Sequence, residues 1–269
     1  MMISGIGAAG MFGLLNYNQL SERGPTVVPE VAEARAIPSA VSPASTGTGG
    51  VAEETGGDED SDEGDDFELP SCTGPAQVAD GDPLEDWSTI VLDPTRGIDP
   101  DFAPPDLVEF DPEDTPGEIV VRDVVVDDLA DLLDSAIDNG TPLTLISGYR
   151  DFSRQNSLFD QLYEERGEAA SETIALPGHS EHQLGTAVDV LRPHMTELST
   201  EFGETAAGEW LAENAHEYGF VISYPDGGED TTCYAYEPWH LRYVGTEVAG
   251  RIIGSDLSPR EWMLQDAAQ

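Results

Sequence analysis

Apolar residues recur at helical spacing in the middle of the chain. Between Val124 and Ile137 they occur every three or four positions, which predicts an amphipathic helix with Gly140 just beyond its end. The residues that this spacing places on one face are Val125, Leu129, Leu132, Leu133 and Ile137. Ser153 is a suitable N-cap for a second helix, from Arg154 to about Glu165, which Gly167 would end.

Short apolar runs bounded by polar or turn-forming residues predict strands. These runs are Trp87–Leu92, Leu143–Ser147, Thr186–Leu191, Phe220–Tyr224 and Tyr236–Val244. Three further helices are expected in the C-terminal half of the chain, at about Glu204–Glu217, Glu247–Ile253 and Pro259–Leu264. Because helices and strands are mixed without strict alternation, we expect an α+β fold with a central, largely antiparallel sheet flanked by helices.

The N-terminal third differs in composition from the rest. Met1 to Leu15 is apolar and rich in glycine, but it is shorter than the about 20 apolar residues that span a bilayer. We interpret residues 1–20 as the remnant of a signal or membrane anchor, with an unstructured tail as the alternative. Residues 21–86 are rich in Pro, Gly, Ser and acidic residues, which predicts a disordered acidic linker. Residues 87–269 would then form the folded domain.

The charge of the chain is extreme. There are 54 acidic residues against 11 basic ones, all of them arginine, so the formal net charge is -43. This charge argues against binding nucleic acid or anionic lipid through bulk electrostatics. Acidic residues are dense in Asp58–Glu68 and continue through Asp123–Asp138. We therefore expect both an acidic linker and an acidic protein surface suited to high salt.

His182 and Asp189 form the first candidate pair for metal binding. Gly185, followed by Thr, Ala and Val, predicts a turn and then a strand, and the turn would bring His182 back towards Asp189. An imidazole and a carboxylate suit zinc better than calcium or magnesium, which prefer oxygen ligands. Taken alone, the two residues are more typical of a buried hydrogen-bonded pair.

Glu237 and His240 change this interpretation. Residues three apart in a regular strand point to opposite faces, so a shared site requires an irregularity, which Pro238 would supply. His240 would complete a His-Asp-His ligand set, and Glu237 would be the general base for the attacking water. The alternative for Glu237 is an exposed carboxylate at the end of a strand.

Arg150 and three polar residues are candidates for substrate contacts. Arg150 directly follows a predicted buried strand, where its guanidinium would polarise a scissile carbonyl and stabilise an oxyanion. The alternative for Arg150 is a surface salt bridge. Gln155, Ser180 and Tyr224 would hold the free carboxylate of a short peptide, although each one alone is more typical of a surface or cap residue.

Three motifs in the chain resemble those of the VanY-like zinc D-alanyl-D-alanine carboxypeptidases. They are Ser-Gly-Tyr-Arg at Ser147–Arg150, Ser-x-His-x-x-Gly-x-Ala-x-Asp at Ser180–Asp189, and Tyr-Glu-Pro-Trp-His-Leu-Arg-Tyr-Val-Gly at Tyr236–Gly245. The motifs occur in order, and the similarity covers about Trp87 to Arg260. The family belongs to a wider group that shares its fold with lysostaphin-type endopeptidases and hedgehog domains.

The resemblance implies a catalytic metal site with one Zn²⁺ per chain. His182, Asp189 and His240 would ligate the zinc, and Glu237 would be the catalytic base. Arg150 would bind the substrate carbonyl and its oxyanion. The fold implied is a central antiparallel sheet with helices around it, in agreement with the pattern of apolar residues.

The resemblance also implies the substrate, which is the stem peptide of peptidoglycan. A D,D-carboxypeptidase would remove its terminal D-alanine, with Gln155, Ser180 and Tyr224 in contact with that residue. An L,D-carboxypeptidase acting on tetrapeptide stems, a D,D-dipeptidase and a non-catalytic cell-wall-binding module are the alternatives. Glu237 and Arg150 argue against a binding module, which needs no general base. We expect an extracytoplasmic monomer, secreted or tethered to the membrane.

The two cysteines are the main departure from the family pattern. Cys233 stands where the resemblance leads us to expect glycine, and Cys72 lies at the edge of the predicted linker. Two cysteines in a protein expected to be exported predict a disulfide beside the active-site strand. The alternative is two unrelated thiols.

Overall fold

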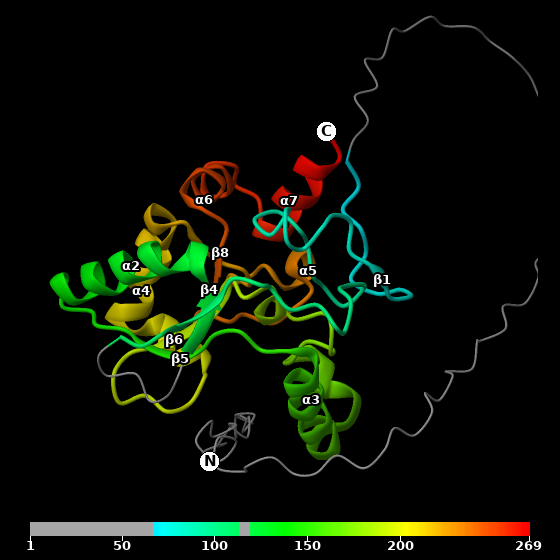
Figure 1. The fold of residues 1–269 in the computed structure, drawn as a ribbon, viewed down its shortest axis with the longest axis horizontal. Coiled ribbons are helices and arrows are strands. Elements are labelled where there is room, and N and C mark those ends of the chain that lie inside the picture. The colour runs from blue at the N-terminus through cyan, green and yellow to red at the C-terminus, as the bar shows by residue number, and fades with distance from the viewer. Residues whose placement is uncertain (1–66, 113–118) are drawn as a thin grey trace, which may run out of the picture.

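The computed structural model describes residues 67–112 and 119–269. The fold class is α+β, as the sequence predicts. A four-stranded sheet lies at the centre, antiparallel between every pair of neighbours (Figure 1). In spatial order its strands are β5 (Thr144–Ser147), β6 (Ala187–Leu191), β8 (His240–Tyr243) and β7 (Phe220–Ile222).

Two small sheets and several helices surround the central sheet. The small sheets are parallel β1 (Gln77–Val78) with β2 (Arg96–Gly97), and antiparallel β3 (Leu107–Phe110) with β4 (Ile119–Arg122). The α-helices are α2 (Val126–Asp138), α3 (Phe152–Arg166), α4 (Ala206–Asn214), α5 (Glu229–Thr232), α6 (Thr246–Ile253) and α7 (Pro259–Ala267). The 3₁₀ helices are η1 (Asp123–Val125), η2 (Gly167–Glu172), η3 (Glu181–Leu184), η4 (Thr200–Glu204) and η5 (Ala215–Tyr218).

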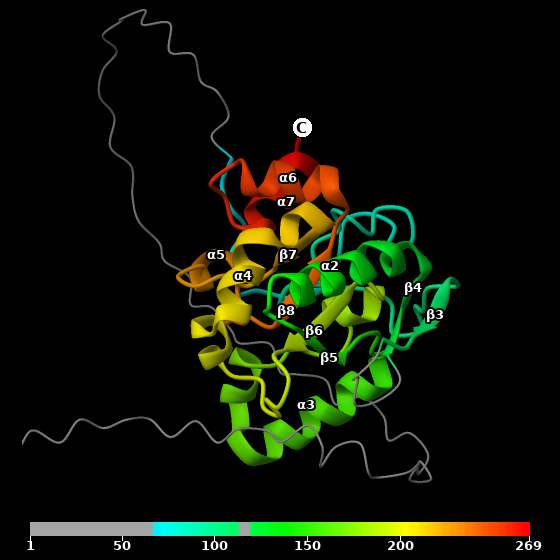
Figure 2. The same ribbon diagram turned by 90° about the vertical axis from the view of Figure 1, so that its left-hand side faces the viewer.

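The two faces of the central sheet carry different side chains. Successive residues of a strand point to opposite faces, so Val188 and Val190 of β6 share the face of Leu241 on the neighbouring β8. These residues belong to the main hydrophobic core, together with buried residues of α2 and α4. Both views place α2 and α4 against one face of the sheet and α3 apart from them, beyond β5 (Figures 1 and 2). The opposite face is left for polar residues.

Helix α2 buries a slightly different stripe from the one predicted. Leu129, Leu132 and Leu133 are buried, but Ala136 completes the stripe and Ile137 is 59% exposed. Ala136 follows Leu129 by seven positions and Leu132 by four, so it continues the buried face of the helix. The N-cap of α3 also differs from the prediction, because Asp151 rather than Ser153 accepts the backbone N–H of Arg154.

Two predicted strands are shorter or absent. Residues 87–92 form turns and irregular backbone, because the carbonyls of Trp87 and Ile90 accept hydrogen bonds from the buried Arg242 instead of joining a sheet. The last strand begins only at His240, and a turn occupies the residues before it. This turn is the irregularity that Pro238 predicts.

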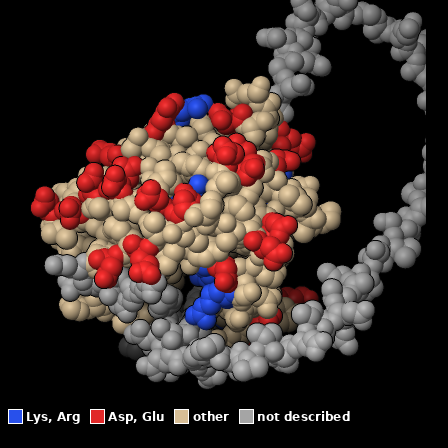
Figure 3. Space-filling view, in the orientation of Figure 1, with Lys and Arg blue, Asp and Glu red and all other residues tan. Residues whose placement is uncertain are grey.

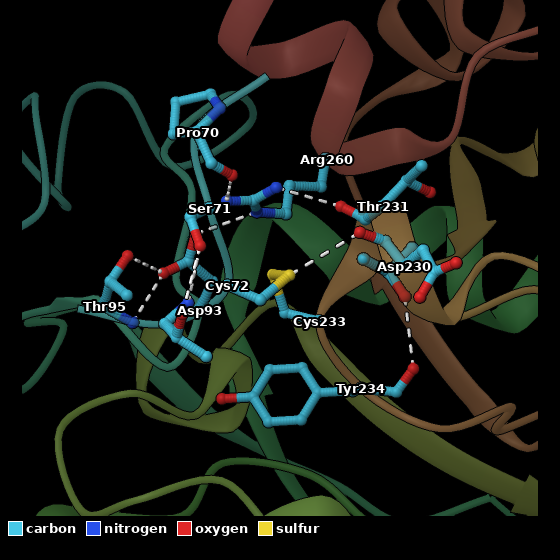
Figure 4. Close-up of a disulfide and its surroundings, with 12 residues drawn as sticks. Pro70, Ser71, Cys72, Asp93, Thr95, Asp230, Thr231, Cys233, Tyr234 and Arg260 are labelled. Carbon is cyan, nitrogen blue, oxygen red and sulfur yellow. Dashed lines mark hydrogen bonds and ion pairs between the residues drawn. A yellow bond between two sulfur atoms is a disulfide. The ribbon is translucent and has the colours of Figure 1, made fainter. Parts of the chain in front are cut away.

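The folded part begins earlier than Trp87. Residues 67–86, which the composition assigns to the linker, include β1 and the buried Ala79. A disulfide between Cys72 and Cys233 joins this segment to the residue that follows α5, as the sequence predicts (Figure 4). The predicted anchor at 1–20 and the first part of the linker, up to residue 66, lie outside the described residues. None of the helices that the structure describes is long and apolar enough to cross a bilayer.

Arg260 reinforces the same junction from α7. Its Nη2 donates to the carbonyl of Pro70 at 2.9 Å, and its Nη1 donates to the carbonyl of Thr231 at 3.0 Å. Its Nε donates to Asp93 at 2.8 Å (Figure 4). The side chain of Arg260 therefore connects the N-terminal segment, the loop before β2 and the end of α5 beside the disulfide.

Candidate active site

Three residues on the polar face of the central sheet lie in one row. Two of them, Asp189 and His240, were predicted from the sequence, and the third is Ser147. In the sheet register, Asp189 on β6 pairs with Ser147 on β5 on one side and with His240 on β8 on the other. The Ser147 hydroxyl donates to Oδ2 of Asp189 at 2.5 Å. The row lies on the face opposite α2 and α4, because Val188 and Leu241 next to it point into the core.

His182 reaches the row from the turn before β6. Residues 181–184 form η3, and Gly185 follows with a φ of 72°, a left-handed conformation that glycine adopts without strain. The turn and strand that Gly185 predicts are thus present. Nδ1 of His182 lies 2.8 Å from the carbonyl of Gly148, to which it must donate. Nε2 of His182 is left facing Oδ2 of Asp189, at 3.2 Å.

His240 presents the opposite ring nitrogen to the row. Its Nδ1 lies 3.1 Å from Oδ1 of Asp189, and its Nε2 lies 2.9 Å from Oε2 of Glu181. The ring of Tyr224 stacks on the imidazole, with centroids 5.0 Å apart. The buried side chains of His182, Asp189 and His240 each offer one ligand atom, and these atoms lie within 4.8 Å of one another. Two imidazole nitrogens and a carboxylate oxygen match the three protein ligands of a catalytic zinc site.

The carboxylates of the cluster shift the pKa values of its histidines. Burial opposes ionisation of Asp189, but the neighbouring His182 and His240 hold the pKa of its carboxyl well below the usual range. Burial likewise opposes a charge on His240, but hydrogen bonds to Asp189 and Glu181 raise its pKa to about 10. Burial and the charge of Arg150 lower the pKa of His182, which favours a neutral ring with a free lone pair. The carboxylates of Asp189 and Glu181 therefore stabilise positive charge at the His240 ring.

Glu237 and Arg150 lie in the same electrostatic environment. The backbone of Glu237 is fixed on both sides, because its N–H donates to the Tyr224 carbonyl and its own carbonyl accepts the N–H of His240. Burial raises the pKa of Glu237 to about 7, while the charges of His240 and Arg150 oppose this rise. The backbone N–H of Arg150 donates to the carbonyl of His182. A carboxyl group with a pKa near 7 is able both to accept and to release a proton at neutral pH.

The predicted substrate residues lie in three different surroundings. Gln155 on α3 is buried; its amide donates to the carbonyl of Ala175 at 2.6 Å, and no described group donates to its amide oxygen. Ser180 is buried directly before η3, and Tyr224 is buried against His240 and Tyr234. In the view of Figure 3, acidic side chains cover much of the surface over α2, and basic side chains show near α3.

Four residues of the site were not predicted from the sequence, and Ser147 is one of them. The other three are buried behind His240, where Ser223 and Arg242 each donate a hydrogen bond to Glu181. Arg242 carried a signal, because it follows His240 by two residues and so shares its face of the strand. Nothing in the sequence pairs Arg242 with Glu181, which lies 61 positions away.

Comparison with known proteins places these features in a family context. The family model described as D-alanyl-D-alanine carboxypeptidase, VanY, matches residues 118–246. A putative carboxypeptidase, YodJ, from Bacillus subtilis is 43% identical over 167 residues, which cover 60% of this chain and 61% of the relative. The chain thus spans about three fifths of the length of this curated relative.

Two solved structures are similar to this chain in both fold and sequence. The LD-carboxypeptidase LdcB superposes with a TM-score of 0.59 at 40% identity, covering 64% of this chain and 83% of LdcB. A mutant of the D,D-pentapeptidase VanY, in complex with Zn(II), superposes with a TM-score of 0.55 at 30% identity. That match covers 66% of this chain and 99% of the VanY chain.

Proposed function

This chain belongs to the VanY family of D-alanyl-D-alanine carboxypeptidases, and we propose that it is a zinc-dependent carboxypeptidase that removes the terminal D-alanine from peptidoglycan stem peptides. The observation that carries the proposal is the buried cluster of His182, Asp189 and His240, with Glu237 and Arg150 acting on the same groups. A structural zinc site usually has four protein ligands, whereas this cluster offers three and leaves a position for chemistry.

Zinc is the metal that fits this donor set and the family. His182 would bind through Nε2, His240 through Nδ1, and Asp189 through a carboxylate oxygen, since these atoms face one another across the row. A bound zinc ion in such a site lowers the pKa of a water molecule and polarises a carbonyl group. All remaining steps belong to side chains of the chain itself.

Glu237 would move the proton that peptide hydrolysis requires. Its carboxylate accepts a proton from the attacking water and then delivers it to the leaving amine of the terminal residue. The pKa of about 7 suits both halves of this transfer. Arg150 carries a permanent positive charge beside His182 and Glu237, and it would stabilise the negative charge that develops on the carbonyl oxygen.

The family resemblance and the local chemistry indicate which residues would contact the substrate. Gln155 has an amide oxygen for which no described donor exists, so it is able to accept a hydrogen bond from a peptide N–H. Ser180 and Tyr224 border the metal cluster through η3 and the stacked ring. We propose that these three residues contact the terminal D-alanine.

A second candidate is L,D-carboxypeptidase activity on tetrapeptide stems. The higher identity to LdcB, 40% against 30% for the VanY structure, favours this alternative, while the family model favours the D,D reaction. Both reactions release D-alanine and use the same metal cluster. The protein would act outside the cytoplasm, where peptidoglycan lies, and we propose that it acts as a monomer.

Hydrolysis of defined muropeptides tests the proposal. The purified protein is incubated with pentapeptide and tetrapeptide stems, and the products are measured by mass spectrometry. We expect the loss of one alanine, abolished by a zinc chelator and restored by added zinc. Shortening of the pentapeptide alone supports the D,D reaction, and shortening of the tetrapeptide supports the L,D reaction. A zinc-loaded protein that shortens neither stem would overturn the proposed function.

A further inference from the structure

The carboxylate of Glu181 lies directly behind His240, on the far side of the ring from Asp189. Its Oε2 is 2.9 Å from Nε2 of the histidine, while Nδ1 on the other side faces Asp189. Glu181 is only 6% exposed, and its side chain hydrogen-bonds to Ser223, His240 and Arg242. Its position therefore suits contact with the metal ligand His240 rather than with substrate.

The surroundings of Glu181 keep its carboxylate ionised. Nη1 of Arg242 donates to Oε1 at 2.8 Å, and the Ser223 hydroxyl donates to Oε2 at 2.6 Å. Arg242 is fully buried and is itself fixed, because its Nη2 donates to the carbonyls of Trp87 and Ile90. A buried carboxylate requires such donors, since an unpaired charge in the protein interior is very costly.

An ionised carboxylate only accepts hydrogen bonds, so it decides where the imidazole keeps its proton. In the metal-free protein both ring nitrogens of His240 face carboxylates. When Nδ1 binds zinc, the ring is neutral and its one N–H is on Nε2, where it donates to Glu181. His182 is arranged the other way round, with its N–H on Nδ1 directed to the Gly148 carbonyl. The two histidines thus turn opposite nitrogens towards Asp189, and each is oriented by an acceptor behind its ring.

We propose that Glu181 is a positioning residue for the metal site: it fixes the Nε2–H tautomer and the orientation of His240, so that Nδ1 is presented to zinc. This inference rests on the proposed function, because it takes His240 as a zinc ligand. Glu181 also lies next to His182 in η3, so one short segment supports both ligand histidines. Arg242 and Ser223 act through Glu181 by holding its two oxygens.

Substitution of Glu181 by glutamine would remove this support at almost constant size. An amide has one oxygen, so it accepts from Arg242 or from His240 in this arrangement, but it does not replace both carboxylate oxygens. Loss of a group that orients a metal ligand typically weakens metal affinity or activity by roughly 10- to 100-fold. We expect Glu181→Gln to raise the zinc dissociation constant by that factor. We also expect it to lower kcat with little change in KM, since Glu181 does not reach the substrate.

A second variant and a control separate positioning from general destabilisation. Ser223→Ala removes one donor to Glu181 but leaves both carboxylate oxygens, so it should weaken zinc binding less than Glu181→Gln does. Asp93→Asn changes an equally buried carboxylate that pairs with Arg260, away from His240. Its zinc affinity, measured at a temperature at which circular dichroism shows the folded protein, should match the wild type.

The experiment is a competition titration of zinc against a chromophoric chelator, on the full chain of each variant. Absence of zinc binding by the wild type would refute the proposed function itself. Wild-type binding with equal affinity in Glu181→Gln would refute only the role of Glu181, and so would equal weakening in Asp93→Asn.

A measurement on the wild type keeps the inference testable if Glu181→Gln does not fold. In the zinc-loaded protein labelled with ¹⁵N-histidine, NMR should show His240 with its proton on Nε2 and His182 with its proton on Nδ1. A proton on Nδ1 of His240 would overturn the proposal.

Discussion

Two buried arginine–carboxylate pairs in this molecule have the same donor–acceptor distance, yet they stabilise different parts of it. Arg242 meets Glu181 behind the metal cluster, and Arg260 meets Asp93 beside the disulfide, each at 2.8 Å with nearly no exposure to solvent. Arg242, Glu181 and Arg260 all line one small internal cavity. The difference lies in the other hydrogen bonds that each carboxylate accepts.

The carboxylate of Asp93 is occupied by its own loop. Its Oδ1 accepts the backbone N–H groups of Thr95 and Arg96 and the Thr95 hydroxyl, and its Oδ2 accepts Nη1 of Arg96 as well as Nε of Arg260. Together with the disulfide, this pair holds chain segments against one another. The carboxylate of Glu181 instead contacts His240. The role of a buried ion pair is therefore inferred from the other groups that its members contact. The presence of the pair alone says little about stability or function.

The largest expected effect is a loss of catalysis, caused by a substitution that leaves both arginine–carboxylate pairs intact. Glu237→Gln should lower kcat by roughly 10²- to 10⁴-fold, because it removes the proposed general base, while zinc affinity and thermal stability stay near wild type. Product release from muropeptides and a zinc titration measure the two quantities. Glu229→Gln, an exposed position on α5, is the matched control and should retain activity. Full turnover in Glu237→Gln would rule out the role given to this residue.

Breaking the Arg260 pair should affect stability rather than catalysis. Asp93→Asn leaves the buried guanidinium of Arg260 without a carboxylate, and breaking such a buried pair costs about 3–5 kcal/mol of unfolding free energy. Urea denaturation measures the loss, and kcat at a temperature well below the transition should be unchanged. The contrast between the two pairs would fail if Asp93→Asn lost zinc as Glu181→Gln is expected to.

The disulfide should stabilise the folded state, as Asp93 is expected to do. Cys72→Ser opens a link between residues 161 positions apart, and removing a native disulfide typically costs about 2–5 kcal/mol. We expect a lower melting temperature in calorimetry, reproduced by adding a reductant to the wild type. Cys233 lies close to Glu237 in the chain, so activity is the informative second readout. A fall in kcat without a fall in stability would show that the disulfide positions the base.

The smallest expected effect is a loss of unfolding free energy at low pH. Burial opposes ionisation of Asp93, but hydrogen bonds from Arg260 and Thr95 outweigh it and lower the pKa of the carboxyl below its ordinary value. In the unfolded chain this group takes up its proton near pH 4, before the folded protein does. The contribution of Asp93 is therefore complete above that pH and is lost as the pH falls through the lower, folded pKa.

A comparison with Asp93→Asn isolates this effect from the other acidic residues. The difference in unfolding free energy between wild type and variant should be constant at neutral pH and should shrink below about pH 4. Denaturation curves between pH 7 and pH 2 measure it. A difference that grows towards low pH would contradict the assignment.

Local patterns in the sequence predicted much of the sheet and the metal cluster. The apolar run before Gly148 and the run after Gly185 are strands β5 and β6, and the spacing of leucines after Val124 marks α2. Gly185 indicated the turn that returns His182 to Asp189, and Pro238 indicated the irregularity before His240. These features depend on neighbours within a few residues, so a single sequence contains their signal.

Predictions that depended on distant partners were less successful. The run at Trp87 has strand-like composition, yet the carbonyls of Trp87 and Ile90 accept hydrogen bonds from Arg242, some 150 positions later. The polar composition of residues 67–86 indicated disorder, yet the disulfide and Arg260 fix part of this segment. Composition describes what a segment is able to bury by itself, and here other segments supply the contacts.

The sequence by itself determined the fold class, and it predicted the candidate ligands His182, Asp189 and His240 that the structure brings together. Residue chemistry and short-range backbone preference are enough for these conclusions. Only the tertiary structure decided that Ser147, Asp189 and His240 are aligned across three strands, and that Glu181 supports His240 from behind. The physical reason is that strand register and buried hydrogen bonds are satisfied between segments many residues apart, and no local pattern records which donor meets which acceptor.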